Sequence, residues 1–154
     1  MQIVTAVKDM HAQGIAHRDI KHLNVLISMV DSKPVAKITD FGMSAYLAKG
    51  ETITKVAGTI GFMAPEVVLE QPSDFKADVW SLGVMLYALI SSNVPFSGKD
   101  RDSTAKLIVE KELAFVKPVW CSVSEECKDL LTAMLTKDQF QRITANDVLE
   151  HPWF

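Results

Sequence analysis

The spacing of apolar and polar positions predicts a helix, two strands and a long loop in the first 63 residues. Over residues 1–13 the apolar positions follow the period of an amphipathic helix, which Gly14 would end. Short apolar runs at 25–27 and 35–38 flank a turn-forming sequence, which is typical of two short strands joined by a turn. Residues 42–63 show no clear period, and a loop of that length is usually functional or disordered.

From residue 64 onward the pattern predicts helices. A short helix is expected over 64–70, with Pro65 in its first turn. Residues 77–91 are apolar nearly all round, which predicts a central helix buried on every side. Further helices are expected at 103–112, from the N-cap Ser124 to Leu135, and after a capping box over 144–147. The expected fold is therefore mostly α with a small β element, in one domain over residues 1–154.

Composition and charge exclude several classes of protein. Apolar residues make up 48% and charged residues 23%, which is unlike disordered, collagen-like or disulfide-scaffold chains. The net charge of −3 gives no reason to expect a nucleic-acid or membrane partner. The spacing of Cys121 and Cys127 fits no zinc site, so both are expected as free thiols. The first residues lack the apolar core of a signal peptide, so we expect a cytoplasmic protein, or a nuclear one.

Three short motifs in a fixed order carry most of the chemistry. The first is His17-Arg-Asp-Ile-Lys-His-Leu-Asn24, and Asp40-Phe-Gly42 and Ala64-Pro-Glu66 follow it. They match the protein-kinase signatures H-R-D-L-x-x-x-N, D-F-G and A-P-E. Each residue alone has an ordinary structural explanation, such as a helix cap, a turn or a solvated side chain. The whole set in this order and at these spacings is highly specific.

These residue types suit phosphoryl transfer, which needs positioning and charge neutralisation more than covalent catalysis. Asp19 would orient the attacking hydroxyl and accept its proton. Asn24 and Asp40 would hold Mg²⁺, a hard cation that prefers oxygen ligands. Lys21 would neutralise the γ-phosphate in flight, and Thr59 would hydrogen-bond back to both Asp19 and Lys21.

The chain resembles the large, C-terminal lobe of a eukaryotic protein kinase, over residues 1–154. Lys21 and the pair Gly58-Thr59 are similar to Ser/Thr kinases rather than Tyr kinases. Short stretches near the C-terminal end are similar to the calcium/calmodulin-regulated group, in particular to calcium-dependent protein kinases, namely residues 119–124, 128–131, 134–135, 142–144 and 149–153. The resemblance implies Mg²⁺-dependent transfer of the ATP γ-phosphoryl group to Ser or Thr of protein substrates.

The resemblance also implies supporting roles for residues away from the reacting atoms. Asp78 matches a buried anchor of the catalytic loop, the segment 17–24, and Arg142 matches the ion-pair partner of Glu66. His17 and Phe41 match stacked core residues that align the active state, with Gly42 completing the D-F-G motif.

For the nucleotide, the resemblance implies a second group of contacts. Leu26 matches the floor of the adenine pocket, while its neighbours Val25 and Ile27 are expected in the core. The nucleotide and its metal would be held by Lys21, Asn24, Leu26 and Asp40.

Arg18, next to Asp19, suggests control by a phosphate in the 42–63 loop, because Arg pairs bidentately with phosphate. Thr54 is the candidate acceptor, although Lys55 occupies the usual position of the family. The expected partners are therefore ATP, protein substrates, and an upstream kinase or a regulatory domain outside this chain.

The sequence departs from the family pattern in three respects. No Gly-rich loop or V-A-I-K lysine is present in these residues, so we expect ATP to be held mainly through Mg²⁺ and turnover to be poor. His22-Leu23 stands where the family usually has Pro-Glu, which puts a preference for basic substrates in doubt. No EF-hand loop is present for calcium.

Two other functions are compatible with these residues. The lobe could be an inactive protein-docking module, although such a module has no physical reason to keep Asp19, Lys21, Asn24 and Asp40. It could also be a small-molecule kinase of related fold, but the 42–63 loop and the A-P-E motif favour a protein substrate. Binding of Mg-ATP separates an intact nucleotide site from a docking module.

Overall fold

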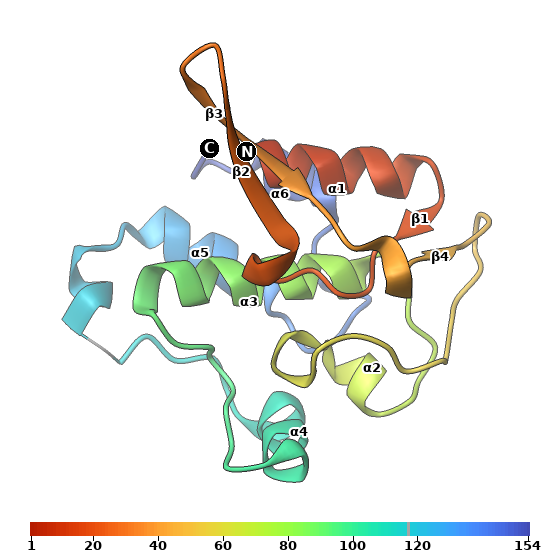
Figure 1. The fold of residues 1–154 in the computed structure, drawn as a ribbon. Helices are drawn as coiled ribbons and strands as arrows, with labels where there is room; N and C mark the ends of the chain where they lie inside the picture. Colours follow the sequence, from red (N-terminus) through yellow and green to blue (C-terminus); the bar gives the residue numbers. More distant parts are fainter. Residues whose placement is uncertain (117) are drawn as a thin grey trace.

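The structure is a computed structural model that describes residues 1–116 and 118–154. Helix α3 (Lys76–Ser91) crosses the middle of the molecule, and the other helices lie around it (Figure 1). The remaining α-helices are α1 (Gln2–Ala12), α2 (Pro65–Val68), α4 (Arg101–Glu110), α5 (Glu125–Met134) and α6 (Ala145–Glu150). Short 3-10 helices are formed by His22–Asn24, Phe41–Met43, Ile60–Phe62 and Pro118–Ser122. The mostly helical fold and the expected helices are present.

Helix α3 is the centre of the hydrophobic core. Its first three turns are buried nearly all round, as the apolar sequence predicts, and include Trp80, which is fully buried. The expectation of burial on every side is wrong for the last turn, where Leu89 is 68% exposed. Helix α5 packs against α3, and α1 packs against α6 and strand β3 (Lys33–Ile38).

The β structure consists of two separate antiparallel pairs. Strands β2 (Val25–Val30) and β3 (Lys33–Ile38) form a hairpin that projects from the molecule beside α1 (Figure 1). Ile27 was expected in the core, but it is 74% exposed, whereas Val25 packs partly against the core.

The second pair, β1 (Ile15–Ala16) with β4 (Ala45–Tyr46), was not expected from the sequence. The 42–63 segment is otherwise irregular, as predicted, apart from the 3-10 turns at its two ends. The pair ties the start of this segment to the chain just before the catalytic loop.

The helix caps agree with those read from the sequence. The hydroxyl of Ser124 accepts a hydrogen bond from the Cys127 backbone nitrogen at the start of α5. Thr144 and Asp147 form the capping box of α6. Both cysteines are free, and burial raises the pKa of Cys127. In the part of the chain that the structure describes, none of the helices has the length and apolar character needed to cross a membrane.

Candidate active site

The carboxylate of Asp19 is at the centre of a hydrogen-bonded network formed by two segments, residues 19–24 and Thr59. Lys21 Nζ lies 2.7 Å from Asp19 Oδ2 and donates to Thr59 Oγ1 at 2.7 Å. The Thr59 hydroxyl donates to Asp19 Oδ1 at 2.8 Å, and the Asn24 amide donates to Asp19 Oδ2 at 3.1 Å. The structure thus brings together all four residues that the sequence assigned to catalysis.

Asp19 is held as a carboxylate by this network. Its side chain lies in a largely enclosed position, and burial alone would raise its pKa. The hydrogen bonds from Lys21, Thr59 and Asn24 and the charge of Lys21 outweigh burial, so the pKa is lowered. An ionised Asp19 can accept the hydrogen bond of a substrate hydroxyl, as a general base or orienting group requires.

Asn24 and Asp40 are brought together through the backbone between them. Thr39 donates its N–H to the Asn24 carbonyl oxygen at 2.9 Å, which places the next residue, Asp40, beside the catalytic loop. The Asn24 side-chain nitrogen is used on Asp19, so its amide oxygen is the atom available to a cation. Asp40 is exposed and adopts a left-handed backbone conformation with φ of 63°.

These two oxygen donors fit a magnesium ion that also binds phosphate. Among the described residues, no cluster of three His, Cys, Asp or Glu side chains could form an all-protein metal site. Mg²⁺ usually takes only one or two carboxylates and completes its coordination with phosphate oxygens and water. Asp40 and Asn24 could therefore hold a metal that arrives with a nucleotide.

Asp78 in helix α3 anchors the catalytic loop through two backbone hydrogen bonds. Its carboxylate, 1% exposed, accepts the backbone N–H groups of His17 and Arg18 at 2.8 Å each. Arg18 has a positive φ of 70°, which is costly for a residue with a side chain. The two hydrogen bonds hold the loop in this strained conformation.

The 42–63 segment closes tightly onto the same loop. Gly58 has a φ of +107°, and a Cβ placed on it would lie 2.4 Å from the Arg18 carbonyl oxygen. Only glycine fits there, and this close approach positions the next residue, Thr59, over Asp19.

His17 connects Asp19 to the segment that carries Asp40. Its Nε2 lies 3.1 Å from the Thr39 carbonyl oxygen, and its Nδ1 accepts the Asp19 N–H at 3.3 Å. Because a carbonyl only accepts, Nε2 carries the proton. The His17 ring is fully buried, and its centroid lies 5.0 Å from that of the Phe41 ring in an edge-to-face arrangement.

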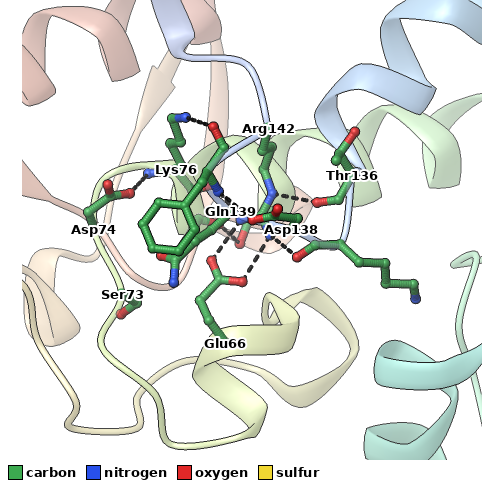
Figure 2. Close-up of polar contacts among 12 residues, drawn as sticks. Glu66, Ser73, Asp74, Lys76, Thr136, Asp138, Gln139 and Arg142 are labelled. Atoms are coloured by element: carbon green, nitrogen blue, oxygen red, sulfur yellow. Dashed lines mark hydrogen bonds and ion pairs between the residues drawn. The ribbon is translucent and has the colours of Figure 1, made fainter.

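A buried ion pair joins the A-P-E motif to the segment between α5 and α6. Arg142 donates two parallel hydrogen bonds to Glu66, at 2.7 and 2.9 Å, and both side chains are nearly inaccessible to solvent. Figure 2 shows that the guanidinium is also surrounded by backbone carbonyls, including those of Lys76 and Thr136. The pair that the resemblance implied is present, and the remaining Arg142 donors are satisfied.

This geometry can be compared with known proteins. A family model, the protein kinase domain, matches residues 1–154. The chain belongs to the protein kinase family. The kinase chain is 44% identical over 143 residues to the serine/threonine-protein kinase PEPKR2 of Arabidopsis thaliana, covering 93% of this chain and 30% of that protein.

Other relatives identify the group within the family. The kinase chain is 40% identical to calcium-dependent protein kinases 21 and 9 of the same plant, over 98% and 99% of its own length. The expected resemblance to Ser/Thr kinases of the calcium-dependent group is confirmed. The chain spans less than a third of the length of these relatives, 28–30%. Its assignment to the large lobe stays a prediction.

One residue of the kinase chain, Phe41, differs from its expected environment. Phe41 contacts His17 as expected, but it is 48% exposed and so is not a core residue here. Leu26, the expected adenine contact, lies on β2 and is 60% exposed. Both apolar side chains are available to a ligand or another protein segment.

The sequence interpretation missed His11. Its Nε2 lies 3.0 Å from Asp78 Oδ2, so it contacts the carboxylate that anchors the catalytic loop. The only sign in the sequence was a polar residue near the C-terminal end of an otherwise apolar helix face. The contact spans 67 positions, and nothing local in the chain indicates it.

Arg18 lies close to the candidate regulatory threonine. Its guanidinium donates to the carbonyl oxygens of Met43 and Lys55, and Lys55 directly follows the exposed Thr54. Burial lowers the pKa of Arg18, while the charge of Asp78 opposes that effect. The guanidinium therefore connects Met43, at the start of the 42–63 segment, with Lys55 further along it.

Proposed function

We propose that residues 1–154 form the large lobe of a Ser/Thr protein kinase and carry its phosphoryl-transfer site. The observation that carries this proposal is the closed network of Asp19, Lys21, Asn24 and Thr59. One carboxylate here receives three donors, one of them cationic, and the exposed Asp40 directly follows Thr39, which is hydrogen-bonded to Asn24. That arrangement suits a group that must stay ionised and accept a proton from a hydroxyl.

Each residue then has a stated role. Asp19 orients the Ser or Thr hydroxyl and holds its proton at Oδ. Lys21 stabilises the negative charge of the transferred phosphoryl group, and Thr59 fixes both side chains in position. Asn24 and Asp40 would hold Mg²⁺, which when bound neutralises the phosphate charges of ATP.

A second part of the proposal concerns regulation. We propose that a phosphate on Thr54 would pair with Arg18, whose guanidinium already contacts the neighbouring residue Lys55. A dianionic phosphate can accept both parallel donors of an Arg and so order the loop. Full activity of Thr54→Ala, together with the absence of phosphate on the wild-type protein by mass spectrometry, would exclude this regulation.

The nucleotide site is tested by thermal unfolding in the presence of Mg-ATP. Binding must raise the melting temperature, since the ligand stabilises only the state that binds it. We expect Asp40→Ala to abolish the rise, whereas Asp9→Ala, an exposed carboxylate change on α1, should leave it intact. Equal shifts in the two variants would contradict the assignment of Asp40.

Transfer itself is tested with labelled ATP and a mixture of protein substrates. Asp19→Asn should keep the Mg-ATP thermal shift and lose phosphorylation of Ser and Thr. A wild-type chain whose melting temperature does not change in millimolar Mg-ATP would point instead to a docking module. Phosphorylation of small molecules but not of proteins would identify the third possibility, a small-molecule kinase.

A further inference from the structure

The backbone of the β2–β3 hairpin points hydrogen-bonding groups outward at both of its edges. In an antiparallel pair, opposite residues that exchange hydrogen bonds alternate with opposite residues that do not. The pair that flanks the two-residue turn exchanges them, so the next pair, Met29 with Pro34, does not. The same holds for Ile27 with Ala36, two positions further along. The free backbone groups of these residues therefore face away from the partner strand, toward the outer edges.

The edge formed by β3 is closed by the side chain of Gln2. Its amide nitrogen donates to the Pro34 carbonyl oxygen at 3.1 Å, and its amide oxygen accepts the Ala36 N–H at 2.7 Å. Helix α1, which carries Gln2, packs against the same strand. Pro34 has no N–H to offer, so this edge is doubly protected against a further strand.

The edge formed by β2 has no such cover. Within residues 1–116 and 118–154, the backbone groups of Ile27 and Met29 form no hydrogen bond to another segment. The strand contains no proline and no charged residue, and every residue after Val25 is exposed. The hairpin projects from the molecule, with its β3 side toward α1 (Figure 1). Strand β2 is therefore an open edge on which another extended strand can pair.

A second copy of β2 matches this edge in the antiparallel orientation. With the two-fold axis at Ser28, Ile27 of each chain lies opposite Met29 of the other. Both residues of such a pair can then exchange N–H and C=O groups, so the outward groups of Ile27 and Met29 are satisfied in both chains. Ser28 faces its own copy in a pair without hydrogen bonds, with Cα atoms about 4.5 Å apart, and its small side chain suits this close approach.

The side chains of β2 also favour a copy of the same strand. In a two-fold dimer each patch meets itself, so a charged strand would repel its copy, whereas β2 is uncharged. Ile27 and Met29 lie on one face, are 74% and 66% exposed, and would cover each other across the new pair. We propose that two copies of this chain associate by antiparallel pairing of their β2 strands, in a continuous sheet of order β3-β2-β2-β3.

Cysteine cross-linking tests the register of this pairing. In a Cys121→Ser background, where the remaining Cys127 is buried, Ser28→Cys places two thiols across the axis within the Cα separation of a disulfide. Oxidised glutathione should therefore convert Ser28→Cys to a covalent dimer. Val30→Cys is the matched control on the same face of the strand. Its two copies would lie about 14 Å apart, beyond the reach of a disulfide.

Charge substitutions test the association without a cross-link. Ser28→Asp and Ser28→Lys each bring two like charges together at the axis, and each should raise the dissociation constant about tenfold or more in sedimentation velocity. An equal mixture of the two variants should restore association, because unlike charges then meet. Ser122→Asp, the same change at an exposed position of the 3-10 helix Pro118–Ser122, should leave the dissociation constant unchanged.

A backbone substitution supplies an independent variant. Ile27→Pro removes an outward N–H that the ladder to β3 does not use, so it should weaken association while the hairpin is kept. Circular dichroism and the melting temperature establish folding of each variant. A wild-type chain that stays monomeric at every concentration would overturn the proposal. So would association that Ser28→Asp leaves unchanged, or equal cross-linking of Ser28→Cys and Val30→Cys.

Discussion

At the scale of single residues, Thr59 is the donor that comes from furthest along the chain to the Asp19 carboxylate. We predict that Thr59→Val raises the pKa of Asp19, because one of the bonds that lower it is lost. A carboxylate with a depressed folded-state pKa contributes stability above its unfolded pKa and loses it as the pH falls through the folded pKa. The variant should therefore be less stable at neutral pH by about 1–2 kcal/mol, and this difference should shrink in acid.

Carboxyl NMR titration and urea unfolding at several pH values measure these two effects of Thr59→Val. Thr54→Val is the matched control, because Thr54 is exposed in the same segment. An unchanged Asp19 pKa in Thr59→Val would show that Lys21 and Asn24 alone hold the carboxylate.

The second prediction at this scale concerns how stability at Lys137 depends on pH. Its amine lies 4.1 Å from the Phe96 ring centroid and donates to the Ile108 carbonyl oxygen, and burial lowers its pKa to about 8. The unfolded chain, with an ordinary lysine pKa near 10.5, then binds more protons between pH 8 and 10.5. The contribution of Lys137 to the free energy of unfolding must therefore rise between pH 8 and pH 10.5.

We therefore expect the stability of wild type relative to Lys137→Met to increase between pH 7.5 and 9.5. The increase should be about 1 kcal/mol after allowance for solvent screening of a half-buried amine. Chemical unfolding at matched pH values measures it. A constant difference across this range would contradict a lowered pKa.

Residue-level prediction from sequence succeeded where the chemistry is local. Asp19, Lys21 and Asn24 lie within six positions, so their spacing alone places them at one site. Contacts that depend on the whole fold were not visible in the sequence. His11 reaches Asp78 across 67 positions, and the exposure of Phe41 depends on what covers it.

At the scale of elements, the β2–β3 hairpin has a tight two-residue turn. Val30 pairs with Lys33, so Asp31 and Ser32 form the turn, with φ values of 47° and 60°. Two positive φ values are typical of a type I′ turn, whose second position strongly favours glycine. Ser32→Gly should stabilise the fold by about 0.5–1 kcal/mol, because relief of left-handed strain exceeds the added freedom of the unfolded chain.

The comparison for Ser32→Gly is Ser28→Gly in the extended strand β2. Ser28 has no left-handed strain to relieve, so Ser28→Gly should destabilise the fold by a similar amount. Differential scanning calorimetry of the two variants would show opposite signs. A loss of stability in both would mean that the turn carries no strain at Ser32.

The Glu66–Arg142 pair connects α2 to the segment between α5 and α6. Arg142→Met leaves a buried, unpaired Glu66 and should cost about 3–5 kcal/mol in urea unfolding. The double variant Glu66→Gln with Arg142→Met should recover part of that loss, since no charge remains buried. Loss of the exposed Lys128–Glu125 pair, by Glu125→Gln, should cost less than about 1 kcal/mol.

Helices were predicted well because their signals are repeated over many residues. Helix α3 begins one residue before its expected start, and the caps Ser124 and Thr144 are as expected. The pair β1 with β4 was missed because two residues are too few for an alternating pattern. Ile27 was misplaced because an apolar strand residue can face another segment as well as the core.

At the scale of the whole molecule, apolar surface is concentrated where the two ends of the described chain meet. Both ends lie beside the hairpin in Figure 1, over a groove of about 480 Å³. The groove is lined from α1, α3 and α5 and by the C-terminal residues Trp153 and Phe154. Ile27 also lines it, and Met29, two positions further along β2, faces the same side with 66% exposure.

Exposed apolar surface of this extent favours association. We predict that the 154-residue chain self-associates with increasing concentration, and that Ile27→Ser with Met29→Ser weakens the association without lowering the melting temperature. Sedimentation velocity over a wide concentration range measures this association.

Phe140→Ser is the control, because Phe140 is 81% exposed away from this groove. If the control weakened association as strongly as the hairpin variant, apolar exposure in general would be responsible. Association that depends on the hairpin alone would instead mark this face as the one that another protein segment covers.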